Sequence, residues 1–351
     1  MAGIFKSMIV KESLHIVRDR RTMLITLLMP LVLLLLFGFA ISTEVNNVRV
    51  VAVVDRHNDW TRDIVQRLSV NDYFSFEGTA AMQEVEGILR RGDADAAIVL
   101  RDDNGQPESQ IIVDASNTAI AKQITVYLSS VLGGNSGSSP VIVHTLYNPQ
   151  MKSAYNFVPG IMGMIFILIC AIMTSVSIVS EKESGTMDLL LVSPVKSRTI
   201  IFGKLVPYFL LSCIILAVML IMAYTVLGLP FSGTVVWVAA VSLLYIVLSL
   251  SLGLLVSTLA RTQVSALIVS AVLFMLPVIL LSGMIFPVEN MPVVLQWLSC
   301  IIPARWYIDA MRTLMIQESD ISYVLGDVAV LCAITMAILF VAIKKFKHDE
   351  N

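Results

Sequence analysis

The sequence predicts an all-α polytopic membrane protein with six transmembrane helices and a small α/β domain between the first two. An N-terminal interfacial helix and an outer re-entrant helix pair complete the expected architecture. Two observations lead to this prediction. Of the 351 residues, 57% are hydrophobic and only 14% are charged, whereas soluble domains carry about 25% charged residues. The charges are also clustered, and the uncharged runs between them match the ~20 apolar residues that a helix needs to cross a bilayer.

The first 21 residues predict a helix at the cytoplasmic membrane surface. It is basic and amphipathic, and Glu12 interrupts its apolar face. That face consists of Phe5, Met8, Ile9 and Ile16. Residues 22–43 carry no charge and predict the first span. The long segment before this apolar run favours a retained membrane anchor over a cleaved signal peptide.

The polar stretch of residues 44–151 predicts a small α/β domain outside the membrane. Apolar and alternating runs predict strands at Val48–Val54, Ala96–Leu100, Gln110–Val113 and Val141–Leu146. Helices are expected over Trp60–Leu68, over Ala80–Arg91, and from Ser116 or Asn117 to Leu132. The Gly/Ser-rich run 133–140 predicts a flexible linker. Asp102 and Asp103 are expected in a solvated turn, and neither metal-ligand spacing nor a catalytic set occurs in the domain.

Residues 152–343 predict the other five spans. The uncharged run 205–260 is too long for one span, and the Gly- and Pro-containing turn at 228–233 divides it in two. The last run, 328–343, is short and needs residues 323–327 to cross the membrane. Residues 344–351 then form a cytoplasmic tail.

Residues 284–322 predict the outer re-entrant segment. Its apolar part, 290–304, is too short to span and is bounded by Pro292 and Pro303. We therefore expect a helix pair there, protected by protein or water. The residues of a possible outer gate are Pro287, Pro303, Arg305 and Asp309, the last two as an ion pair.

The distribution of Lys and Arg predicts the orientation. Basic residues concentrate in the N-terminal segment, in the loop 181–204 and in the C-terminal tail, and the turn at 228–233 has none. The positive-inside rule places both termini in the cytoplasm. The domain of residues 44–151 is long enough to cross the membrane regardless of its charge.

The loop 181–204 is the most specific part of the sequence. Gly185 permits a sharp change of direction, and Thr186 can cap a short helix. That helix carries Met187, Leu190 and Leu191 on one edge, and Pro194 ends it. The pattern predicts a short helix held beneath the membrane. A surface turn with snorkelling charges explains the same residues.

This loop resembles the coupling loop of the ABC type-2 permease family, in which an acidic-Gly-Thr stretch precedes a Leu-rich helix and a Ser-Pro pair. The resemblance covers nearly the whole chain and is strongest to members with a large outer domain, which export drugs, lipids or sodium. It implies a separate cytoplasmic ATPase that pushes on the coupling helix and the N-terminal helix, and a second permease subunit, identical or paralogous. By position, the coupling residues are Glu181, Glu183, Gly185, Thr186, Met187, Leu189, Leu190, Ser193 and Pro194.

These features predict a transport subunit rather than an enzyme. The chain has no phosphate-binding loop of the form G-x-x-x-x-G-K-[ST], so ATP and magnesium are expected in the partner chain, with no cofactor or metal here. The span centres are uncharged, which favours a hydrophobic or amphipathic substrate, such as a drug or lipid. The alternatives are an ATPase-driven mechanotransmission protein acting on a periplasmic partner, a sodium or ion efflux permease, and a secondary transporter. A periplasmic adaptor is a further possible partner.

Overall fold

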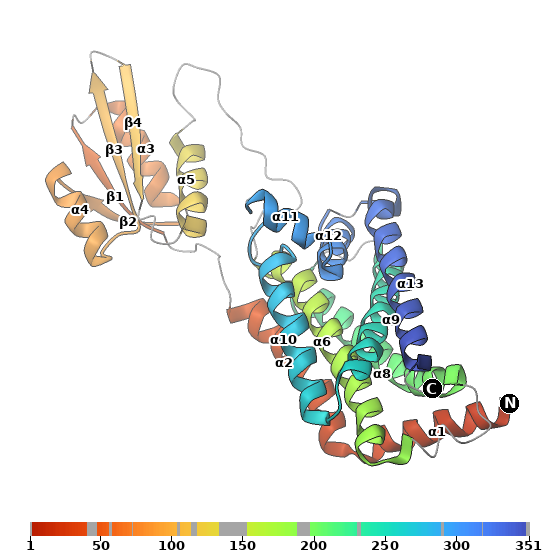
Figure 1. The fold of residues 1–351 in the computed structure, drawn as a ribbon. Coiled ribbons are helices and arrows are strands. Elements are labelled where there is room, and N and C mark those ends of the chain that lie inside the picture. The colour runs from red at the N-terminus through yellow and green to blue at the C-terminus, as the bar shows by residue number, and fades with distance from the viewer. Residues whose placement is uncertain are drawn as a thin grey trace. The chain divides into compact units, whose positions relative to one another are not determined.

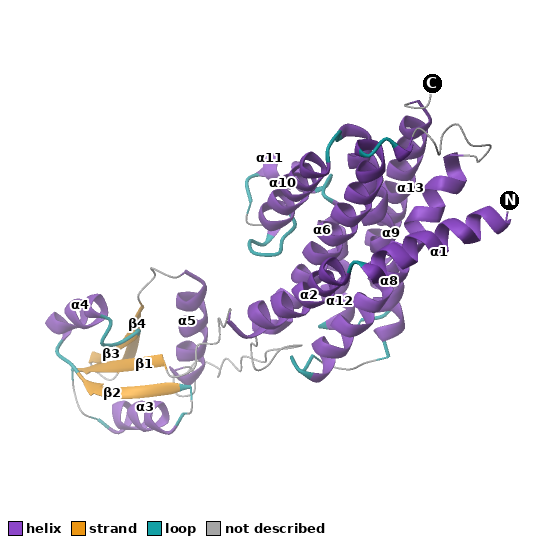
Figure 2. Cartoon of the chain, turned by 90° about the horizontal axis from the view of Figure 1, so that it is seen from below, coloured by secondary structure: helices purple, strands orange, loops and turns teal. Residues whose placement is uncertain are grey.

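The computed structural model describes residues 2–40, 48–55, 58–71, 73–103, 106–113, 118–132, 153–187, 197–229, 233–288, 291–317 and 319–348. The chain forms two compact units. One is a helical bundle made of residues 1–41 and 153–351, and the other is the domain of residues 42–152. The strands of the described residues all belong to the second unit (Figure 2).

The helical unit is built from long apolar helices (Figure 1). Five of them, α6, α8, α9, α10 and α13, are long and apolar enough to cross a membrane. The pair α1–α2, whose axes differ by 68°, provides a sixth candidate. The chain is therefore a polytopic membrane protein with five or six candidate spans. The bounds of its helices are α1 Ala2–Arg18, α2 Arg20–Ala40, α6 Ser153–Glu183, α8 Ser197–Thr225, α9 Val235–Leu259, α10 Gln263–Leu281, α11 Val293–Ser299, α12 Pro303–Met315 and α13 Leu325–His348, with a 3₁₀ turn at Ile321–Val324.

Helix α6 lies at the centre of the bundle and packs against α2, α8, α9, α10 and α12. Small residues allow the closest of these contacts. A Cβ atom on Gly253 of α9 would lie 2.6 Å from the carbonyl oxygen of Ala171 in α6. The rings of Tyr245 and Tyr307 stack with centroids 4.1 Å apart, and the Tyr245 hydroxyl donates to the carbonyl of Gly163. These contacts join α6, α9 and α12 into one core.

The second unit contains a four-stranded sheet with the order β2-β1-β3-β4. Its strands are β1 Val48–Val54, β2 Phe74–Thr79, β3 Ala96–Asp103 and β4 Gln106–Val113. Strand β1 is parallel to β2 and β3, and β4 is antiparallel to β3. Helices α3 Asp59–Val70 and α5 Thr118–Leu132 cover one face, and α4 Met82–Arg91 covers the other.

The structure confirms the predicted strands that begin at Val48 and Ala96 and the helices α3, α4 and α5. Strand β2 was not predicted. Its sequence Phe-Ser-Phe-Glu-Gly-Thr has only two apolar side chains, Phe74 and Phe76, and Ser75 and Glu77 separate them from any longer apolar run. The expectation of a solvated turn at Asp102 and Asp103 was wrong. Both residues end β3, where they pair with Pro107 and Gln106 of β4. The predicted linker 133–140 and strand 141–146 lie outside the described residues.

The predicted helix pair near residues 290–304 exists, although its second helix is longer than expected. Helix α11 ends at Ser299, and α12 runs from Pro303 to Met315. The side chains of Tyr307, Met311 and Leu314 in α12 are fully buried in the main core. Pro303 takes the first helical position of α12, where a missing N–H costs nothing. Helix α12 is therefore a core element, whereas Trp297 and Ile301 at α11 remain exposed.

Candidate functional site

The charged end of α6 makes contacts with four other helices. Glu181 forms ion pairs with Lys11 of α1 and Lys204 of α8. The ammonium of Lys182 donates to the carbonyl of Ser257 in α9, at 2.8 Å. The carboxylate of Glu183 accepts a hydrogen bond of 3.0 Å from the backbone N–H of Gln263, the first residue of α10. Three consecutive residues thus tie the end of α6 to the adjoining ends of the bundle.

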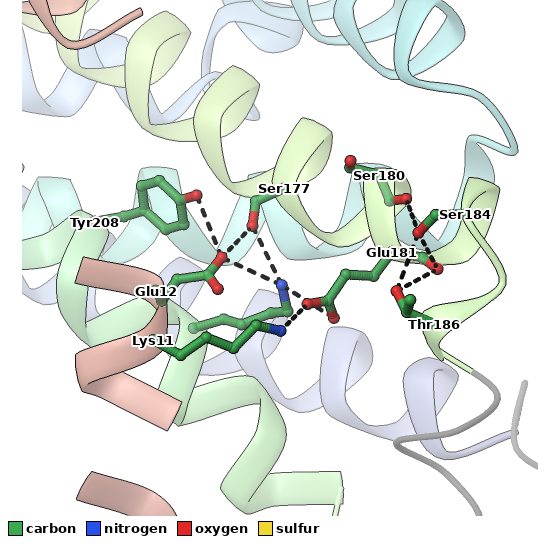
Figure 3. A network of polar contacts seen from close by, with 9 residues as sticks. Lys11, Glu12, Ser177, Ser180, Glu181, Ser184, Thr186 and Tyr208 are labelled. Carbon is green, nitrogen blue, oxygen red and sulfur yellow. Dashed lines mark hydrogen bonds and ion pairs between the residues drawn. The ribbon is translucent and has the colours of Figure 1, made fainter. Parts of the chain in front are cut away.

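Four charged side chains form a chain of alternating sign at this end of the bundle (Figure 3). Lys11 lies 2.9 Å from Glu181, and the other oxygen of Glu181 lies 3.2 Å from the ammonium of Lys204. The same ammonium lies 3.3 Å from Glu12. We call Lys11, Glu181, Lys204 and Glu12 the charge chain. Both of its ends belong to α1, so it joins α1 to α6 and α8.

The inner part of the charge chain is buried. The Lys204 and Glu12 side chains are only 5% and 6% exposed. The Ser177 hydroxyl donates to Glu12 at 2.6 Å, and the Tyr208 hydroxyl lies 3.4 Å from the same oxygen. Lys204 also donates to Ser177 at 3.3 Å. Each buried charge therefore has an opposite charge and a hydroxyl as partners, which is what burial of an ion pair requires.

These contacts change the pKa values of the two α1 side chains. Burial disfavours the Glu12 carboxylate, but the Lys204 charge and the hydrogen bonds from Ser177 and Lys204 outweigh it, so the pKa of Glu12 is lowered. The hydrogen bond to Glu181 raises the pKa of Lys11. Both side chains are therefore charged at neutral pH.

The predicted apolar face of α1 faces the bundle. Phe5, Met8 and Ile9 are partly buried, and Ile16 packs against the main core. A Cβ atom on Gly203 of α8 would lie 3.1 Å from the Cβ of Met8, so this glycine allows α1 to approach closely. Glu12 interrupts this apolar face, as the sequence indicated, and it is also the most buried residue on the face. Two features of the sequence could have indicated this ion pair. They are the single acid on an apolar face of α1 and the basic residue Lys204 next to Gly203 in α8.

The turn after α6 contains Gly185, with φ at +73°. This left-handed conformation favours glycine. The Thr186 hydroxyl donates to the carbonyl of Glu181 and contacts the Ser184 hydroxyl, so its bonds run back to α6. Met187 is buried in the main core. The other predicted coupling residues lie outside the described residues, namely Leu189, Leu190, Ser193 and Pro194.

The residues predicted for an outer gate are brought together in part. Arg305 and Asp309 are 4.0 Å apart on α12, and Pro303 begins that helix. One guanidinium nitrogen of Arg305 donates to the Ser299 hydroxyl at 2.6 Å and to the carbonyl of Gln296 at 3.2 Å, which holds α11 against α12. Pro287 belongs to the segment between α10 and α11 instead.

Arg312 of α12 is a residue that the sequence did not single out. Its guanidinium donates to the carbonyl of Gly283, at 2.8 Å, in the segment after α10. Gly283 has φ at +82°. Arg312 thus fixes this turn against α12. In the sequence, only the positive charge of Arg312 among mostly apolar neighbours pointed to a structural role for this residue.

The described residues contain no group of three or more His, Cys, Asp or Glu side chains that could hold a metal ion. The charge chain balances two acids against two bases. Its ion pairs hold α1, α6 and α8 together at one end of the bundle.

Comparison with known sequences decides the family. The profile of the ABC-2 family transporter proteins matches residues 20–344. The chain belongs to the ABC-2 transporter family. The match begins at the first residue of α2 and ends within α13, so it covers the helical unit from α2 onward and the inserted domain.

Three permeases from Escherichia coli are similar to the chain. It is 28% identical to the probable multidrug ABC transporter permease YbhS, over 99% of this chain and 97% of that protein. It is also 28% identical to the probable multidrug ABC transporter permease YbhR, over 94% of each chain. The inner membrane transport permease YhhJ is 24% identical over 69% of this chain and 68% of its own length. The chain is therefore an ABC transporter permease, as the coupling loop indicated.

Proposed function

We propose that this ABC-2 permease forms the transmembrane pathway of an exporter for a hydrophobic or amphipathic substrate, such as a drug or lipid. A separate ATPase subunit drives it. The observation that carries the proposal is the convergence of α1, the end of α6 and the start of α8 at the charge chain, immediately before the Gly185 turn. The relatives YbhS and YbhR, both named as probable multidrug permeases, support the substrate class.

The proposed topology has six spans, α2, α6, α8, α9, α10 and α13, in the bacterial inner membrane. Both termini and the segment 181–204 lie in the cytoplasm, since basic residues are concentrated there. Helix α1 lies along the cytoplasmic surface, and its 68° angle to α2 supports this arrangement. The domain of residues 44–151 and the segment 284–322 lie outside.

The proposed ATPase docks beneath the Gly185 turn and α1, binds ATP and magnesium itself, and pushes on the coupling segment. A second permease subunit completes the pathway. The apolar side chains exposed on α10, which include Leu267, Val272 and Leu276, are available to lipid or to that subunit.

The test is co-purification of the full chain from its native membrane. We expect an ABC ATPase with the wild type, and reduced binding or uncoupled hydrolysis with Gly185→Val. A β-branched residue is strained at positive φ, by about 1–2 kcal/mol. Gly185→Asn is the matched control, because Asn tolerates this conformation and a Cβ at this position meets nothing within 4 Å. Absence of any ATPase from the wild-type preparation would refute the proposal.

Flux measurements separate the competing functions. In proteoliposomes containing the permease and the ATPase, we expect ATP-dependent movement of a fluorescent lipid or of ethidium. ATP-dependent movement of sodium alone would favour an ion exporter. Hydrolysis without any flux would favour a mechanotransmission protein.

A further inference from the structure

The charge chain fixes α1 on the bundle in one register. Lys11 and Glu12 are adjacent in sequence, yet Lys11 contacts α6 and Glu12 contacts α8 through Lys204. The ammonium of Lys204 donates hydrogen bonds to Glu12 and Ser177 and forms an ion pair with Glu181. A shift of α1 by one residue moves its side chains by about 1.5 Å along the helix axis. Such a shift would break contacts at both ends of the charge chain.

The burial of Lys204 and Glu12 raises the free-energy cost of changing this register. Separating Lys204 from Glu12 would leave two charges in a region where both side chains are more than nine-tenths buried. A buried charge that loses its partner is strongly destabilising. Helices α1 and α8 are therefore expected to move together, with Lys204 as the connecting group.

The charge chain also reaches the turn that follows α6. Glu181 is 13% exposed and lies four residues before Gly185, and the Thr186 hydroxyl donates to its backbone carbonyl. A displacement of this turn thus acts on Glu181 first. From there it passes to Lys204 of α8 and to Lys11 and Glu12 of α1.

We propose that Glu12 and Lys204 are positioning residues for energy coupling, which transmit the displacement of the Gly185 turn to α1. The proposal rests on the proposed function, because it assumes an ATPase that pushes on this turn. The two acids and two bases balance, so the charge chain carries no net charge that would recruit an ion from solution. Its chemistry fits a mechanical link between helices better than a ligand site.

The test compares two segments of the full permease–ATPase complex in lipid nanodiscs. Hydrogen–deuterium exchange is measured for residues 2–18 and 181–187, with and without ATP plus vanadate. In the wild type we expect nucleotide to change the exchange of both segments. In Glu12→Leu/Lys204→Met, which replaces the buried pair by apolar side chains of similar size, we expect the change in residues 181–187 to persist and the change in residues 2–18 to be reduced, because only the exposed Lys11–Glu181 pair still connects α1 to α6.

Arg67→Met is the control, since Arg67 pairs with Asp63 within α3 of the other unit and takes no part in the charge chain. Both segments should respond in this variant as in the wild type. Glu12→Gln keeps the size and hydrogen bonding of the side chain and should reduce the response of residues 2–18 even if the double variant assembles poorly. An undiminished response of residues 2–18 in the double variant and in Glu12→Gln would overturn the inference. No response of either segment in the wild type would instead refute the ATPase-driven function itself.

Discussion

The ammonium nitrogen of Lys204 lies 3.3 Å from a carboxylate oxygen of Glu12, which is 192 positions away in the sequence. This buried pair predicts an asymmetric effect of substitution. Lys204→Met alone leaves the Glu12 carboxylate buried without its charged partner, which typically costs about 3–5 kcal/mol. The additional change Glu12→Leu removes that charge and should recover most of the loss. Thermal unfolding in detergent measures both variants, and equal melting temperatures for the single and double variants would contradict the prediction.

The lowered pKa of Glu12 predicts a loss of α1 docking in acid. A carboxyl whose pKa is lower in the folded state stabilises the protein above its unfolded value, about 4.3. That contribution is lost as the pH falls through the folded pKa. A spin label on exposed Leu14 of α1 should become more mobile as the pH falls from 7 to 3. In Glu12→Gln the label should be more mobile at pH 7 and nearly insensitive to pH through this range.

The close approach of α9 to α6 predicts that Gly253 tolerates no side chain. The Cβ of Gly253→Ala would lie within 2.8 Å of the backbone of Ala171. Backbone cannot rotate away as a side chain can, so the helices must separate. Overpacking of this kind costs about 1–3 kcal/mol. Gly326→Ala in α13 is the control, because a Cβ there meets nothing within 4 Å. Comparable melting temperatures for the two variants would rule out the tight α6–α9 contact.

The contacts of Arg305 predict that it holds α11 in place. Arg305→Gln removes the charged donor that reaches Gln296 and Ser299. The adjoining Cys300, which lies 3.1 Å from the same guanidinium nitrogen, should then react several-fold faster with a maleimide. Peptide mass spectrometry separates Cys300 from the other three cysteines. Asp309→Asn weakens the 4.0 Å pair but leaves the hydrogen bonds from Arg305 to Gln296 and Ser299 in place, so the rate should remain nearly unchanged.

The sequence predicted the long elements because their apolar runs reflect one dominant requirement, the burial of backbone polar groups in helices within lipid. Strand β1 was equally clear, since five valines and one alanine among seven consecutive residues fit a strand covered on both faces. Strand β2 was harder to predict, because Ser75 and Glu77 interrupt its apolar residues and its pairing with β1 cannot be read from the local sequence. Short edge strands depend on neighbours distant in sequence, which local patterns do not record.

The candidate site depends even more on contacts between residues that are distant in the sequence. Glu181 was singled out from the pattern of the loop, whereas Glu12 was interpreted as a defect in an apolar face. Its role depends on Lys204 and Ser177, which lie 192 and 165 residues away. Helical periodicity ranks an acid on an apolar face as unfavourable, and only the packed structure supplies the compensating partners.

The domain of residues 42–152 leaves the bundle after α2 and returns to it at α6. These two helices pack directly against each other, with Thr26 of α2 close to Met173 of α6. Leu34 of α2 is fully buried in the same core as α6. The domain of residues 42–152 is thus an insertion between neighbouring helices. Exchange of this domain for that of a related permease should therefore leave the bundle's own assembly intact, so the two units can be engineered as separate modules.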